Sequence, residues 1–155
     1  MSKVSIKHYQ KLVGKNAINE LRFLAEKLKG KTIQCLNSTR VGGGVAEILS
    51  RLIPLLNELG IDAKWDVIEA DPSFFNVTKA FHNALHGNPV KITNEMFQEF
   101  LATGEKILSS TKLYGDIVFI HDPQPIFLVK RKNEMDNKWI WRCHVDVSNP
   151  DREVW

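Results

Sequence analysis

Three consecutive glycines, Gly42, Gly43 and Gly44, separate a short apolar run from a segment with helical spacing. The apolar run covers residues 32–36, and apolar residues recur every three or four positions over residues 45–59. A strand, a glycine turn and a helix in this order aim backbone N–H groups and the positive end of the helix dipole at one point, which favours a bound anion such as a phosphate. This glycine triplet therefore predicts an α/β unit with a candidate ligand site.

The composition is that of one globular domain. The chain has 155 residues, of which 43% are hydrophobic and 25% are charged. Its net charge of +3 is too small to indicate a nucleic-acid partner. The N-terminus lacks a signal-peptide core and no apolar run is long enough to span a bilayer, so we expect a cytoplasmic protein without a membrane partner. The cysteines, Cys35 and Cys143, are expected to be reduced core thiols.

Strand-like and helix-like segments alternate along the chain. Helix caps are predicted at Asn16, Asp71 and Thr93, and Pro54 predicts a kink in the helix after the glycine triplet. This alternation predicts the α/β class with a mostly parallel sheet flanked by helices. The expected strands cover residues 32–36, 64–68, 117–120 and 139–143, and the expected helices cover residues 17–28, 45–59, 72–86 and 94–108.

The end of the chain reads as the start of a further helix. Ser148, Asn149, Pro150 and Asp151 combine a cap, a first-turn proline and an acidic residue. The chain stops at Trp155, barely one or two turns later. We therefore expect it to be one piece of a longer protein.

Polar residues follow three of the expected strands. Ligands of open α/β sheets bind beyond the carboxyl ends of the strands. If the sheet is parallel, the three groups share one edge, and this convergence is the strongest functional signal in the sequence. The candidate residues at this edge are Gly42, Gly43, Gly44, His121, Asp122, Gln124, Arg142, His144 and Asp146.

The glycine triplet alone has other interpretations. It can be no more than a tight turn, and it lacks the lysine and the hydroxyl of a P-loop. The dinucleotide-binding pattern needs a third glycine where this chain has Glu47. Glu69 nevertheless follows the second strand where a ribose-binding acid is expected, so a nicotinamide-binding domain stays open as an alternative.

The histidines and Arg142 also have structural alternatives. Asp122 can cap a turn while His121 bonds to a backbone group, and Arg142 can be a paired core cation beside tryptophans. His82 and His86 are four residues apart on an expected helix, which is a spacing that metal ligands use. Because no third ligand of suitable spacing follows, a surface or cleft-lining pair is favoured, and we expect no metal and no cofactor.

Four ordered motifs resemble a known family. They are NSTRVGGGVAEILSRLIPLL, WDVIEADPSFFNVTKAFHNALHGNP, VFIHDPQP and WIWRCHVDVSNP. Together they resemble trehalose synthase of the glycosyltransferring type, which makes trehalose from a nucleotide-diphosphate glucose and glucose. The retaining trehalose phosphorylases are similar in the third and fourth motifs. The resemblance extends from about residue 5 to the end of the chain.

The resemblance implies the GT-B architecture, in which the active site lies between two Rossmann-like domains. Residues 1–155 would be the N-terminal, acceptor-side domain, and the C-terminal domain that holds most of the nucleotide sugar would be missing. The implied partners are the NDP-glucose donor, glucose or trehalose, and that missing domain. Such a domain is expected to be inactive alone. The nucleotide, the physiological direction and the oligomeric state stay open, as does the alternative of a phosphorylase domain or a non-catalytic sugar- or nucleotide-binding module.

The family also implies roles for individual residues. His144 and Asp122 would be the catalytic residues, with His144 in a positioning and electrostatic role and not as a nucleophile. Retaining transfer is usually drawn as same-face attack, and the chain has no obvious carboxylate pair at glycosidase spacing. The residues implied to bind the substrates are Gly42, Gly43, Gly44, Asn83, His121, Gln124, Arg142 and Asp146.

Overall fold

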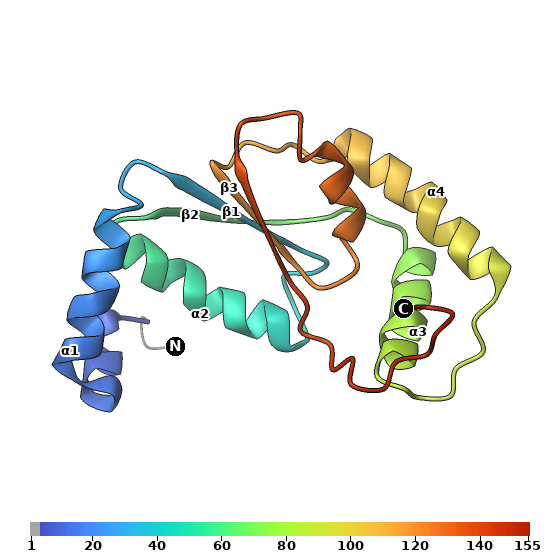
Figure 1. The fold of residues 1–155 in the computed structure, drawn as a ribbon, viewed down its shortest axis with the longest axis horizontal. Coiled ribbons are helices and arrows are strands. Elements are labelled where there is room, and N and C mark those ends of the chain that lie inside the picture. The colour runs from blue at the N-terminus through green and yellow to red at the C-terminus, as the bar shows by residue number, and fades with distance from the viewer. Residues whose placement is uncertain (1–3) are drawn as a thin grey trace.

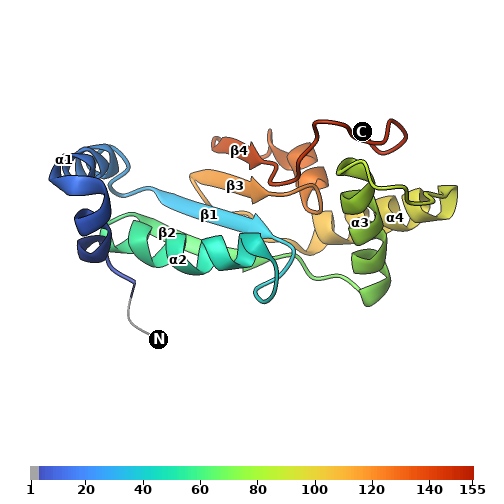
Figure 2. The same cartoon turned by 90° about the horizontal axis from the view of Figure 1, so that it is seen from below.

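The computed structural model describes residues 4–155, which form a parallel sheet flanked by helices. The elements are α1 (Ile6–Glu26), β1 (Thr32–Asn37), α2 (Gly44–Glu58), β2 (Asp62–Val67), α3 (Pro72–Leu85), α4 (Asn94–Ser110), β3 (Ile117–His121), the 3₁₀ helix η1 (Ile126–Arg131) and β4 (Lys138–Arg142). The strand order is β2-β1-β3-β4, and every neighbouring pair is parallel. α2 runs along the sheet, α1 lies near the end where the strands begin, and α3 lies beyond their carboxyl ends (Figures 1 and 2).

The predicted class is confirmed, and each predicted strand is present within two residues of its predicted bounds. β1 is buried on both faces, as parallel strands usually are. Leu36 packs in an apolar cluster with residues of α3, α4 and η1, whereas Cys35 packs in a second cluster with residues of α1 and α2. The sheet therefore separates two cores, and its carboxyl edge remains for polar side chains.

Both cysteines are free thiols. Cys35 is fully buried, and this burial, with a smaller contribution from the charge of Asp66, raises the pKa of its thiol to about 12. Cys35 is therefore an uncharged core residue at neutral pH, as the sequence predicts. Cys143 is half-buried just after β4.

The first helix starts earlier than its sequence pattern predicts. α1 begins at Ile6 and passes through a kink at Gly14, whose φ of 84° is not helical. The N-terminal end is held by Glu58 of α2, which accepts hydrogen bonds from the Ser5 hydroxyl at 2.9 Å and from the Ile6 N–H at 2.9 Å. The cap expected at Asn16 is wrong, because α1 already begins at Ile6. Its N-cap is Ser5, whose side chain accepts from the Lys7 N–H, and the distant Glu58 carboxylate adds a second acceptor.

The helix expected near the end of the chain is absent from the described residues, where only a turn follows Asp151. The Asp146 carboxylate accepts from both the N–H and the hydroxyl of Ser148, so this serine does not act as a helix cap. The Asp151 N–H instead donates to the Ala84 carbonyl of α3 at 3.0 Å. The tail is thus attached to the end of α3, as Figure 1 shows.

Candidate functional site

A cavity of about 370 Å³ opens at the carboxyl ends of β1 and β3. It lies where the sequence predicts the three polar groups to converge. The residues that line it are Asn37, Ser38, Thr39, Gly42, Gly43, Gly44, Val45, Ala46, Ile48, His82, Asp122, Gln124 and His144. The loop of residues 38–44 is called the glycine loop below.

The glycine loop ends at the N-terminus of α2. Gly42 and Gly43 have φ angles of 74° and 81°, which side-chain-bearing residues rarely adopt, and Gly43 is the N-cap of α2. A Cβ atom on Gly44 would meet nothing within 4 Å in the described part of the chain, and its φ is not positive. The first two glycines are therefore needed for the backbone turn that presents the first amides of α2 to the cavity. These amides form a ready site for an anion.

Asp122 is held in an unusual backbone conformation beside the cavity. Its φ of 67° makes it the one residue other than glycine with positive φ among residues 4–155. Its N–H donates to the Arg142 carbonyl at 2.9 Å, its carbonyl accepts from the Trp141 indole at 3.0 Å, and its carboxylate accepts from the His144 N–H at 2.8 Å. These contacts join the ends of β3 and β4 and fix the His144 backbone, and strained residues of this kind cluster at functional sites.

His144 is paired with a buried histidine. Its Nε2 lies 3.1 Å from Nδ1 of His121, which is fully buried and stacks on Phe119 at 4.2 Å between ring centroids. Burial, followed by the charges of His144 and Arg142, lowers the pKa of His121 to about 4. His121 is therefore neutral near pH 7 and supports His144 from behind.

The structure brings together six of the ten residues that the sequence singles out. Gly42, Gly43, Gly44, Asp122, Gln124 and His144 line the cavity. The other four lie outside its lining: His121 sits behind His144, Asn83 is half-buried on α3, and Arg142 and Asp146 are exposed. The alternative of Arg142 as a core cation is wrong, because Arg142 is exposed on the edge strand β4.

The sequence did not predict His82 as a site residue, although it favoured a surface or cleft-lining position for His82 and His86. His82 lines the cavity, and its Nε2 lies 2.9 Å from Nε2 of His86. Partial burial, and then the neighbouring His86, lower the pKa of His82. Asn37, Ser38 and Thr39 were also missed, although their position between a strand and the glycine triplet was a usable signal.

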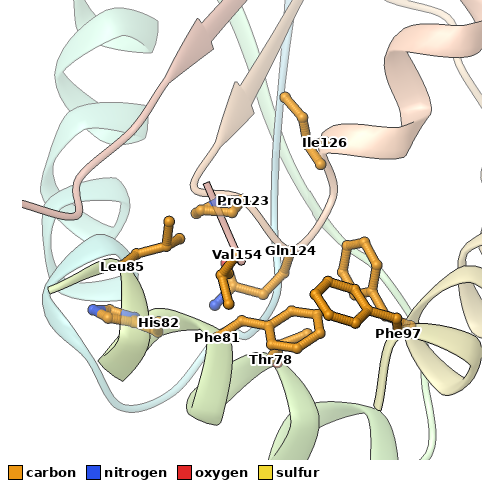
Figure 3. A pocket seen from close by; sticks show the side chains of 10 residues that line it. Thr78, Phe81, His82, Leu85, Phe97, Pro123, Gln124, Ile126 and Val154 are labelled. Carbon is orange, nitrogen blue, oxygen red and sulfur yellow. The ribbon is translucent and has the colours of Figure 1, made fainter. Parts of the chain in front are cut away.

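A smaller, apolar pocket of about 160 Å³ adjoins the cavity. His82 and Gln124 line both, so the two share a wall. Figure 3 shows Phe81 and Phe97 on one side of the pocket and Pro123 and Val154 on another. The site therefore combines amides, histidines and a carboxylate with an apolar surface beside them, a combination typical of small-molecule sites.

Residues 4–155 contain no group of three or more His, Cys, Asp or Glu side chains that could hold a metal ion. Within the same range, none of the helices has the length and apolar character needed to cross a membrane.

The fold and the cavity define a class of protein: a Rossmann-like α/β domain with a cavity where a glycine loop meets histidine and aspartate side chains, at the carboxyl edge of a parallel sheet where such domains bind ligands. Residues 35–155 match the family model described as "Trehalose synthase, N-terminal domain". The chain belongs to this family.

Several known proteins are similar to nearly the whole chain. The trehalose synthase of Pyrococcus horikoshii is 45% identical over 99% of the chain, and that of Rubrobacter xylanophilus is 38% identical over 94%. The trehalose phosphorylase of Grifola frondosa is 34% identical over 97% of the chain. The chain spans 37%, 36% and 24% of the length of these relatives, respectively.

Proposed function

We propose that residues 1–155 are the acceptor-side domain of a retaining glycosyltransferase that forms trehalose from an NDP-glucose and glucose. The observation that carries the proposal is the cavity in which the glycine loop faces Asp122 and His144. The similarity to trehalose synthases at 38–46% identity supports the same reaction. The cytoplasmic location that the sequence predicts is part of this proposal.

The glycine loop supplies the anion site of the reaction. Glycosyl transfer develops negative charge on the departing phosphate and positive charge on the sugar ring. The first amides of α2 stabilise the phosphate, because Gly44, Val45 and Ala46 at the start of this helix line the cavity and the N–H groups of a first helical turn have no partner within the helix. The role of Gly42 and Gly43 is to allow the positive φ angles of the backbone turn that leads into α2.

The opposite wall orients the sugars. His144 is fixed at its backbone by Asp122 and at its ring by His121, so its position changes little when substrate binds. Asp122, Gln124 and His82 offer donors and acceptors for acceptor hydroxyls. The role of His144 is positioning and electrostatic, and same-face attack needs no enzyme nucleophile. Asn83, Arg142 and Asp146 stay candidates for contacts that form only in the assembled cleft.

The rest of the donor site belongs to a C-terminal domain in this proposal. The relatives are more than twice as long as the chain, which supports a second domain that binds most of the nucleotide. We expect no trehalose formation from UDP-glucose and glucose by the chain alone. Detectable trehalose formation by the chain alone would contradict this expectation.

The nearest alternative is a domain of a retaining trehalose phosphorylase, which the relatives at 29–34% identity support more weakly. A non-catalytic sugar- or nucleotide-binding module is a second alternative. A nicotinamide-binding domain is less favoured, because Glu47 stands where the third glycine of that fingerprint is needed.

Amide NMR on the ¹⁵N-labelled chain separates these functions. We expect UDP-glucose to shift the amides of the glycine loop and trehalose to shift those near His144 and His82, with sucrose as the control sugar. Shifts at the glycine loop with NAD alone, and none with UDP-glucose or trehalose, would overturn the proposal. A two-domain parent, assayed with glucose and either NDP-glucose or glucose 1-phosphate, separates the synthase from the phosphorylase.

A further inference from the structure

We propose that Trp65 and Arg40 are positioning residues that hold the glycine loop in its binding conformation, although neither lines the cavity. Trp65 is on the edge strand β2, and Arg40 lies in the loop itself. The inference builds on the proposed function, because it gives the loop the task of binding a phosphate. It concerns how the loop keeps its shape before any ligand is present.

The first contact runs from Trp65 to the residue that precedes the loop. The indole N–H of Trp65 donates to Asn37 Oδ1 at 2.8 Å. The amide nitrogen of the same Asn37 side chain donates to the Thr39 carbonyl at 2.8 Å. Asn37 is buried and lines the cavity, so the indole fixes the side chain that shapes the first turn of the loop.

The second contact returns from the loop to Trp65. The Arg40 guanidinium donates to the Trp65 carbonyl and lies over the indole ring, 5.1 Å from the ring centroid. This geometry combines a hydrogen bond with a cation–π contact. Trp65 therefore holds the chain at Asn37 and again at Arg40, and the segment between them is restrained at both ends.

The part of the loop beyond Arg40 has little else to restrain it. The Val41 side chain is 81% exposed, and Gly42 and Gly43 follow with positive φ. Thr39 closes a small turn, because its hydroxyl donates to the Val41 carbonyl at 2.8 Å and accepts from the Val41 N–H at 3.2 Å. The contact of Arg40 with Trp65 attaches this turn to the sheet.

Restraint of this kind affects ligand binding directly. An anion bound by backbone amides must meet them in one arrangement, and a loop that samples several arrangements loses affinity on ordering. Glycines broaden the range that the free loop can sample. Trp65 and Arg40 thus reduce the ordering cost at a site that they do not touch.

The test compares variants of this chain by ¹⁵N relaxation and by titration with inorganic pyrophosphate. Arg40→Ala removes both contacts of the guanidinium, and Arg40→Lys keeps the charge but loses the planar stack. Trp65→Phe keeps a ring for Arg40 but leaves Asn37 Oδ1 without its donor. Arg22→Ala, on the exposed surface of α1, is the matched control for loss of an arginine.

We expect Arg40→Ala to lower the heteronuclear NOE at Val41, Gly42 and Gly43 and to weaken pyrophosphate binding about threefold, the size expected for one exposed cation–π contact. The NOE values and the pyrophosphate affinity of Arg40→Lys should fall between those of the wild type and Arg40→Ala. Trp65→Phe should lower the heteronuclear NOE at Thr39 as well. The melting temperature of Arg40→Ala should match that of Arg22→Ala, because Arg40 is exposed.

Unchanged loop NOE values in both Arg40→Ala and Trp65→Phe would overturn the inference. Failure of the wild-type chain to bind pyrophosphate would contradict the proposed function instead, because the NOE comparison needs no ligand. An equal loss of affinity in Arg40→Ala and Arg22→Ala would mean that overall charge, and not positioning, governs binding.

Discussion

Nε2 of His144 lies 3.1 Å from Nδ1 of His121, and the two rings are stacked with their centroids 5.4 Å apart. His144 lines the cavity, whereas His121 is completely buried behind it. A single proton bridges the two ring nitrogens, so the tautomer of one histidine sets that of the other. This pairing links the buried His121 to a cavity that only His144 faces.

His144→Ala in a two-domain enzyme that contains this domain should lower turnover at least about tenfold, because preorganised contacts to the reacting sugar are lost. Steady-state kinetics with NDP-glucose and glucose measure the change. His8→Ala is the matched control, since His8 is exposed on α1. Kinetics equal to those of the control would make His144 a structural residue.

His121 should make the stability of the chain depend on pH between about 6.5 and 4. Its pKa is lowered to about 4 in the folded chain, so in this window the unfolded chain binds the additional proton. The free energy of unfolding should therefore fall as the pH drops from 6.5 to 4, by up to about 3 kcal/mol, and recover as the pH rises.

Urea unfolding at several pH values measures this dependence. His121→Gln should flatten it, whatever the variant does to the stability at pH 7. His82→Gln is the comparison, because the pKa of His82 is lowered in the same direction and its contribution must be separated. An identical pH profile for the wild type and His121→Gln would rule out His121 as the titrating group.

Gly43→Ala should lower the free energy of unfolding by about 1 kcal/mol, because φ is 81° at this position and a Cβ atom makes that conformation strained. Gly44→Ala should change it by less than about half of that, since Gly44 is helical and its Cβ would meet nothing within 4 Å in the described structure. Urea unfolding of both variants gives the comparison. Equal decreases in the free energy of unfolding of Gly43→Ala and Gly44→Ala would show that the positive φ at Gly43 adds no strain for a residue with a side chain.

Gly87→Ala should detach the C-terminal tail. A Cβ atom there would lie 2.5 Å from the Asn149 carbonyl oxygen, whereas one on Gly60 would meet nothing within 4 Å among residues 4–155. Both glycines have positive φ, so Gly60→Ala carries the same backbone strain without the collision. We expect faster hydrogen exchange of the Asp151 amide in Gly87→Ala than in Gly60→Ala. Similar hydrogen exchange of the Asp151 amide in the two variants would mean that the tail moves to accommodate the added Cβ atom and keeps its contact with α3.

The sequence predicted the strands well because their signal is local. Residues 117–120 form an uninterrupted apolar run, and its shortness and its β-branched and aromatic residues favour a strand buried on both faces. The caps were predicted less reliably. Thr93 does cap α4, where its side chain accepts from the Met96 N–H. α1, however, starts at Ser5, which caps the helix and also donates to the Glu58 carboxylate. A contact between residues so far apart in sequence leaves no local pattern.

The sequence by itself determined that the chain is α/β, that its sheet is parallel and that its polar strand ends converge on one edge. Periodicity and glycine placement carry this information, because they act within a few residues. Only the tertiary structure decided which side chains face the cavity. His121 ends β3 and is buried behind His144, and the position of α3 beyond the carboxyl ends of the strands places His82 at the cavity (Figure 2). Both outcomes depend on burial against distant residues, which adjacent residues in the sequence do not encode.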